Sequence, residues 1–126
     1  MIHEEIVTYE VAKLAKEKGF PLQKVIKQNG RAFFYELPQS HPDWANCDAW
    51  YLPTQSLLQR WLREEKGIVV EVFMDDDSDT PLTYNIHQYK DGKWECVSHH
   101  HGNYYAVNDW ELCLEDALKY ALENLI

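Results

Sequence analysis

Residues 53–72 read PTQSLLQRWLREEKGIVVEV, and this stretch decides the fold class. Thr54 is a typical helix N-cap, and Gly67 suits the left-handed position that ends a helix. Between them, apolar residues recur on one helical face and polar residues on the other. The apolar set is Leu57, Leu58, Trp61 and Leu62, and the polar set is Gln55, Ser56, Gln59, Arg60, Arg63 and Glu64. The β-branched run that follows predicts a strand, and we expect Trp61 at the centre of the core.

The rest of the chain supplies two more helices and two hairpins. Thr8 and Gly19 bracket a short amphipathic segment, and an apolar stripe from Leu114 to Leu125 marks a helix at the C-terminal end. Asn29-Gly30 and Asp91-Gly92 are two-residue turn signals of β-hairpins. The second hairpin predicts the pairs Lys90–Lys93, Tyr89–Trp94, His87–Cys96, Ile86–Val97 and Tyr84–His99, with Leu82, Tyr84 and Ile86 facing the helices.

These elements predict an α+β fold. Three helices, at approximately 8–18, 54–66 and 110–125, pack on a mainly antiparallel sheet of about five strands in the order α-ββ-α-βββ-α. A chain of 126 residues is the size of one domain, so we expect residues 1–126 to form a single unit.

Charge and composition exclude several function classes. The net charge is −9, and residues 32–126 carry seventeen acidic against six basic side chains, which disfavours direct binding to nucleic acid. No apolar run is long enough for a membrane span, and the acidic start, Met1 to Glu5, lacks the features of a signal peptide. Three irregularly spaced cysteines indicate reduced thiols. We therefore expect a cytoplasmic protein, for which a homodimer is compatible with the sequence.

The histidine run at residues 99–101 is the first candidate for chemistry. His99 and His101 share a face of an extended strand and are candidate metal ligands together with nearby Cys96. His41 and Cys47 complete a conceivable tetrahedral set, but the spacing matches no established zinc pattern. A polar strand end is the preferred interpretation, so no metal site and no cofactor is predicted.

No catalytic signature stands out. The run Asp75-x-Asp77-x-Asp79 opens like a calcium loop, but Thr80 and Ile86 stand where glycine and glutamate are required. The His87–Cys96 pair lacks an orienting third group, and the chain has no nucleophile elbow or phosphate loop. The sequence therefore favours a protein that is not an enzyme.

Aromatic residues in the long stretch 38–53 are the candidates for a protein interface. Trp44, Trp50 and Tyr51 lie there among three prolines, and large aromatic side chains are the usual anchors of interfaces. Packing of these rings over the core is the competing interpretation.

Three segments together resemble the small uncharacterised phage- and prophage-associated proteins of gut bacteria. They are TYEVAKLAKEKGF at 8–20, PTQSLLQRWLRE at 53–64 and EDALKYAL at 115–122. The resemblance implies a mobile-element context and a cytoplasmic setting, and it brings no catalytic residues. Residues 38–51 and the histidine run are not part of the pattern.

The function predicted from the sequence is that of a non-enzymatic accessory protein of a mobile element, acting through contacts with an unknown protein partner. The alternative is a metal- or small-ligand-binding domain that uses His99 and His101. A further idea is an acidic decoy for nucleic-acid-binding proteins of the host.

Overall fold

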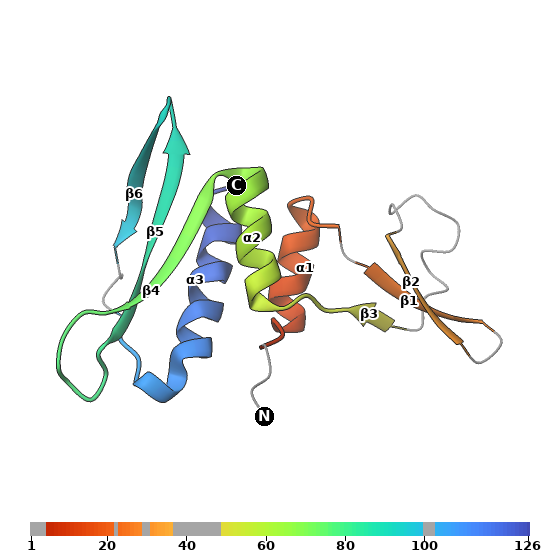
Figure 1. Ribbon diagram of the computed structural model, residues 1–126, viewed down its shortest axis with the longest axis horizontal. Helices are drawn as coiled ribbons and strands as arrows, with labels where there is room; N and C mark the ends of the chain where they lie inside the picture. Colours follow the sequence, from red (N-terminus) through yellow and green to blue (C-terminus); the bar gives the residue numbers. More distant parts are fainter. Residues whose placement is uncertain (1–4, 22, 29–30, 37–48, 100–102) are drawn as a thin grey trace.

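The computed structural model describes residues 5–21, 23–28, 31–36, 49–99 and 103–126. At 23–28, 31–36, 49–51 and 98–99 only the backbone is described. In these residues three α-helices accompany two three-stranded antiparallel sheets (Figure 1). The helices are α1 (Tyr9–Glu17), α2 (Gln55–Lys66) and α3 (Trp110–Asn124), the last preceded by a short 3-10 turn, η2 (Val107–Asp109). The predicted α+β class and the three helices are thus confirmed.

The predicted strand count and element order are wrong. The first sheet has the order β2-β1-β3 and consists of β1 (Gln23–Gln28), β2 (Arg31–Glu36) and β3 (Ala49–Tyr51). The described order is therefore α-βββ-α-βββ-α, with six strands in two sheets instead of about five in one. The strand missed is β3, which has three residues and is too short to show an alternating pattern.

The second sheet is a meander of β4 (Ile68–Met74), β5 (Leu82–Lys90) and β6 (Lys93–His99), in that spatial order. Asp91 and Gly92 both have positive φ, as the two-residue turn requires. The predicted pairs Lys90–Lys93, Tyr89–Trp94 and His87–Cys96 are confirmed. Beyond them an irregularity between Ile86 and His87 places Ile86 opposite Ser98 and Asn85 opposite His99, so the last two predicted pairs are wrong. A bulge of one residue has this effect on every later pair.

One face of the second sheet packs on the helices. Leu82, Tyr84 and Ile86 of β5 are buried as predicted, and Ile68 and Val70 of β4 join them. The three helices lie beside this face, with α3 nearest to the sheet, while β1–β3 lies on the far side of α1 (Figure 1). The core is therefore formed by α3, the inner faces of α1 and α2, and the sheet β4–β6.

Helix α2 differs from the sequence prediction at three side chains. Leu58 and Leu62 are fully buried, but Leu57 is 47% exposed. Trp61 lies at the edge of the core, where its ring meets Phe20 edge-on at a centroid distance of 5.3 Å. Gln55, expected in solvent, is buried and donates from Nε2 to the Glu111 carbonyl at 2.9 Å. The predicted helical stripe is thus rotated away from Leu57 toward Gln55.

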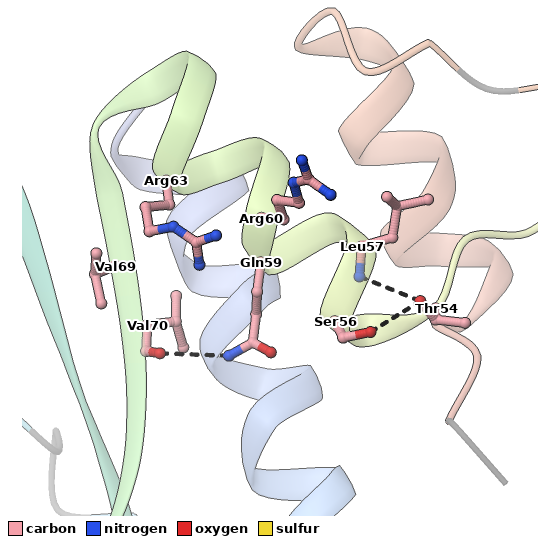
Figure 2. Close-up of a pocket in the computed structure, with 8 residues that line it drawn as sticks. All are labelled: Thr54, Ser56, Leu57, Gln59, Arg60, Arg63, Val69 and Val70. Atoms are coloured by element: carbon pink, nitrogen blue, oxygen red, sulfur yellow. Dashed lines mark hydrogen bonds between the residues drawn. The ribbon is translucent and has the colours of Figure 1, made fainter.

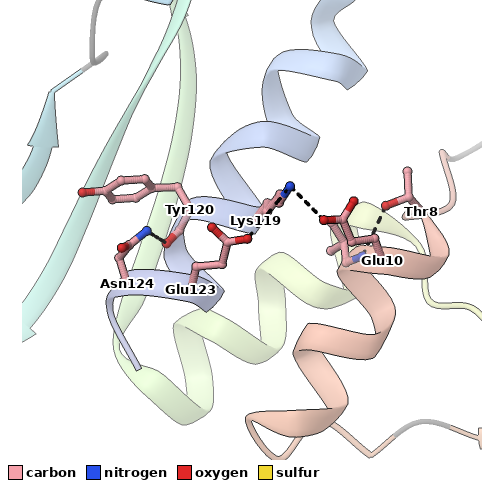
Figure 3. A network of polar contacts seen from close by, with 7 residues as sticks. Thr8, Glu10, Lys119, Tyr120, Glu123 and Asn124 are labelled. Atoms are coloured by element: carbon pink, nitrogen blue, oxygen red, sulfur yellow. Dashed lines mark hydrogen bonds and ion pairs between the residues drawn. The ribbon is translucent and has the colours of Figure 1, made fainter.

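Polar contacts tie α1 to α3. Lys119 Nζ lies 2.9 Å from Glu10 Oε1 and 3.9 Å from Glu123 Oε1, so it links the two helices at the surface (Figure 3). At the start of α1, Glu115 Oε1 accepts a hydrogen bond from the Thr8 backbone N–H at 2.7 Å. Thr8 Oγ1 in turn accepts from the Val11 N–H at 3.3 Å as the N-cap of α1. The start of α1 is therefore held by its own cap and by a carboxylate of α3.

We expect Leu58→Ala to lower the free energy of unfolding by about 2–5 kcal/mol, because it removes a fully buried side chain. The neighbouring Leu57→Ala is the matched control and should cost less than about 1 kcal/mol, since Leu57 is half exposed. Urea melts of both variants measure the difference. Equal losses would contradict the orientation of α2.

Glu115 gives a second prediction. Burial raises the pKa of this carboxyl group, and the negative charges of Glu5 and Asp116 add to the rise, against the lowering effect of the Thr8 N–H. A carboxyl whose pKa is raised by folding stabilises the fold below its unfolded pKa, and this contribution is lost as the pH rises through the folded pKa. Glu115→Gln, which still offers an oxygen to Thr8, should therefore gain stability relative to wild type between pH 4 and pH 7. Urea melts across that range test this, and a pH-independent difference would contradict it.

A groove between α2 and the edge of β4

A groove of about 580 Å³ lies between the exposed face of α2 and strand β4 (Figure 2). Val69 and Val70 line it from β4, and the remaining lining side chains come from the N-cap and outer face of α2. Ser56, Arg60 and Arg63 recur at helical spacing and so follow one side of α2. The groove therefore runs along the helix beside an edge strand of the second sheet.

Gly67 positions the two walls. It ends α2 with φ 64° and ψ 38°, and β4 begins at the next residue, so the chain reverses within a single residue. A Cβ at this position would lie 3.3 Å from the Cβ of Tyr89. Glycine is thus required both by the left-handed backbone and by the close approach of β5.

Hydrogen-bonding groups line the floor and one end of the groove. Gln59 Nε2 donates to the Val70 carbonyl at 3.4 Å, across the gap between helix and strand. At the start of α2, Thr54 Oγ1 accepts from the Leu57 N–H at 3.2 Å and lies 3.2 Å from Ser56 Oγ. The half-exposed Leu57 side chain adds an apolar surface at this end. The lining is therefore a mixture of apolar and hydrogen-bonding groups, as binding sites for other molecules have.

The charge of the groove is opposite to that of the body of the protein. Its described lining includes two arginines and no carboxylate. Residues 32–126 carry only six basic side chains, and three of these, Arg60, Arg63 and Lys66, lie on α2.

The two arginines differ in their contacts. Arg60 Nε donates to Glu64 Oε1 at 3.0 Å in an exposed pair along the helix. Arg63 has no carboxylate within ion-pair distance among the residues that the structure describes, and in Figure 2 its guanidinium lies in the space between α2 and β4. Arg63 is therefore a cationic group available to a ligand in the groove.

The predicted metal candidates are not brought together in the described part of the chain. His101 lies outside the described residues, and only the backbone of His99 is placed, opposite Asn85. Cys96 pairs with His87 as predicted. Among residues 5–21, 23–28, 31–36, 49–99 and 103–126, no three His, Cys, Asp or Glu side chains are arranged to hold a metal ion.

The acidic run Asp75–Asp79 connects β4 to β5 at the surface. Hydrogen bonds from the Ser78 side chain and backbone N–H lower the pKa of Asp76. Tyr104 donates its hydroxyl to Asp75 Oδ2 at 3.2 Å. Two of these carboxylates are thus engaged in contacts within the chain, in agreement with a connecting turn.

The predicted interface candidates lie outside the described side chains. Trp44 is outside the described residues, and the backbones of Trp50 and Tyr51 form part of β3, paired with Lys24 and Gln23. The prediction of an aromatic interface at 38–53 therefore stays a prediction.

A part-buried polar contact joins α3 to Tyr105, which precedes the helix and forms a bridge to Leu82 of β5. Tyr105 donates its hydroxyl to Asp116 Oδ2 at 2.6 Å, and burial raises the pKa of Tyr105. Cys113 is fully buried, which raises the pKa of its thiol to about 11. A thiol of this kind is protonated at neutral pH and is a packing group, because only the thiolate is a good nucleophile.

No protein-family model matches this chain, and neither a curated protein nor a solved structure matches it. None of the helices in the described ranges is long and apolar enough to cross a membrane. Within the part of the chain that the structure describes, the groove is the candidate binding site, and it was not predicted from the sequence. One feature of the sequence could have indicated it: half of the basic residues of 32–126 lie in a single helix, α2.

We expect Cys113 to resist alkylation in the native protein. With a pKa of about 11, only about one molecule in a thousand carries the thiolate at pH 8, and burial blocks access as well. Brief iodoacetamide treatment followed by peptide mapping should modify the half-exposed Cys96 at least about tenfold faster than Cys113. Unfolding in urea is the control that should remove the difference. Equal rates in the native state would contradict the burial of Cys113.

Proposed function

We propose that this protein is a non-enzymatic accessory protein of a mobile element that binds another protein through the groove between α2 and β4. The observation that carries the proposal is the composition of the groove. Exposed arginines, a half-exposed leucine and hydrogen-bonding side chains meet there beside an edge strand. Interfaces between proteins combine the same elements, with arginine and large apolar groups at their centre.

The charge distribution supports a protein partner over a nucleic acid. Two arginines form a small cationic site, whereas the acidic groups are spread over residues 32–126. A nucleic acid strand carries closely spaced phosphates, which the many carboxylates of residues 32–126 would repel. A protein segment can place a few acidic side chains at the arginines alone.

The proposed role without catalysis rests on the sequence, in which no catalytic signature stands out. Cys113 is buried and protonated, and the Tyr105 hydroxyl donates to Asp116. The alternative, a metal- or small-ligand-binding domain that uses His99 and His101, stays a prediction, because His101 and the side chain of His99 lie outside what the structure describes. The mobile-element context rests on the resemblance of three sequence segments to phage-associated proteins.

Photocrosslinking in cells of the source organism tests the proposal. A benzoylphenylalanine replaces Arg60 in one strain and Lys93, on the outer strand of the same sheet, in the control strain. Irradiation should attach a defined protein at position 60 and not at position 93. Adding Arg63→Glu to the first strain should reduce that product, because it reverses a charge in the groove.

Two results would contradict this function. One is equal crosslinking at both positions, which indicates random collisions. The other is a product at position 60 that consists of this chain alone, since that identifies the groove as a contact between two copies. Circular dichroism of each purified variant confirms that the fold is retained.

A further inference from the structure

Strand β4 is an edge of the second sheet, and its sequence is unusual for an edge. The strand reads IVVEVFM, with Glu71 as its single charged residue, and it pairs only with β5 in the sheet order β4-β5-β6. The opposite edge, β6, carries Lys93 and Glu95. Proteins normally protect an edge strand with charges, prolines or bulges, because its unpaired backbone groups attract other strands.

Two hydrogen bonds define which backbone groups of β4 point outward. Gly67 O accepts from Tyr89 N at 2.8 Å, and Asp75 N donates to Pro81 O at 2.7 Å, so residues 67 and 75 face β5. Direction alternates along an antiparallel strand, which means that residues 69, 71 and 73 also face β5. The N–H and C=O groups of Val70, Val72 and Met74 therefore point away from the sheet.

The groove borders this outward edge. Its β4 wall is formed by Val69 and Val70, and the Val70 carbonyl accepts the long hydrogen bond from Gln59 Nε2. That bond confirms the outward direction of Val70. It comes from a flexible side chain at 3.4 Å, so a backbone N–H of an incoming strand can replace it at the usual distance of about 2.9 Å.

We propose that the groove takes an acidic, extended protein segment that adds to β4 as a fourth strand of the sheet. The segment forms backbone hydrogen bonds with Val70, Val72 and Met74, and its carboxylates contact Arg63 and Arg60. The inference rests on the proposed function and specifies the partner's chemistry. Backbone pairing at a sheet edge supplies affinity in this mode, and side-chain pockets supply specificity.

The spacing of the arginines suits such a segment. Side chains on one face of a strand repeat about every 7 Å, which is two residues of about 3.3 Å each. Arg60 and Arg63 are separated by a helical rise of about 4.5 Å, and their long side chains cover the remaining distance. An acidic residue on the incoming strand can therefore face Arg63. Arg60, which extends away from β4 in Figure 2 and pairs with Glu64, reaches a second carboxylate only after a change of rotamer.

A synthetic peptide tests the inference directly. The probe is acetyl-(Thr-Glu)4-amide, and the matched control is acetyl-(Thr-Lys)4-amide, each titrated into the full ¹⁵N-labelled protein. The acidic peptide should slow hydrogen exchange at the amides of Val70, Val72 and Met74. The amides of Glu71 and Phe73, which already face β5, should keep their rates.

Two variants separate the charge contribution from unfolding. Arg63→Glu should weaken binding of the acidic peptide by about tenfold or more, whereas Lys93→Glu makes the same charge change on β6 and should leave it unchanged. Thermal melts check that both fold. If Arg63→Glu is unfolded, Arg63→Gln replaces it, with a smaller loss expected in the same direction.

The outcomes distinguish this inference from the proposed function. Absence of binding by the acidic peptide, equal binding by the lysine peptide, or binding without added protection at Val70, Val72 and Met74 each overturns strand addition. A partner crosslinked at position 60 would still stand in those cases, as evidence for a groove that binds in another way. If the peptide adds to β4 but no protein is crosslinked at position 60 in cells, strand addition stands and the proposed function, binding of a protein partner through the groove, is contradicted.

Discussion

The described core depends on one helix, α3, which contacts α1, α2, β4 and β5. Ala117, Leu118, Ala121 and Leu122 are fully buried. The small alanines allow close approach of neighbouring backbones, and the leucines fill the space between them, as dense packing requires. Because α3 contacts β4 and β5 as well as both other helices, it fixes α2 at a defined distance from the sheet. The groove is thus a consequence of helix packing: α2 uses one face on α3 and presents the other beside β4.

Helix caps and turn residues predicted most of the helices and strands correctly. The features that they did not predict depend on contacts between elements. Thr8 and Thr54 cap their helices as expected, and Gly67 and the Asp91-Gly92 turn have the backbone conformations that their sequences indicate. The hairpin register was predictable up to His87–Cys96, because the turn determines the nearest pairs. A bulge beyond that point has no local sequence signal, so Ile86–Val97 and Tyr84–His99 could not be predicted correctly. Strand β3 was missed because three residues carry too little pattern to stand out.

The errors on α2 have one cause. Whether Gln55, Leu57 and Trp61 are buried was predicted from helical periodicity alone. Periodicity locates the centre of the apolar face well, but it does not decide whether residues at the margin of that face are buried. The Glu111 carbonyl on α3 makes burial of Gln55 favourable, and no property of residues 53–72 could indicate that partner. The groove was missed for the same reason. Arg60 and Arg63 look like an ordinary solvated face until β4 is placed beside them, and that placement depends on α3.

The short range of screened electrostatic interactions makes the proposed acidic partner compatible with an acidic protein. Charges separated by more than about 8 Å are largely screened at physiological ionic strength, so most of the carboxylates of this chain act only on what lies next to them. At Arg63 the nearest described charges include no carboxylate in contact, so attraction dominates there at short range. A long polyanion extends beyond the groove and meets the acidic surface, whereas a short extended segment does not. In the proposed complex, the net charge of −9 would act as a filter on the length of an anionic ligand, and the strand edge of β4 would select its backbone conformation.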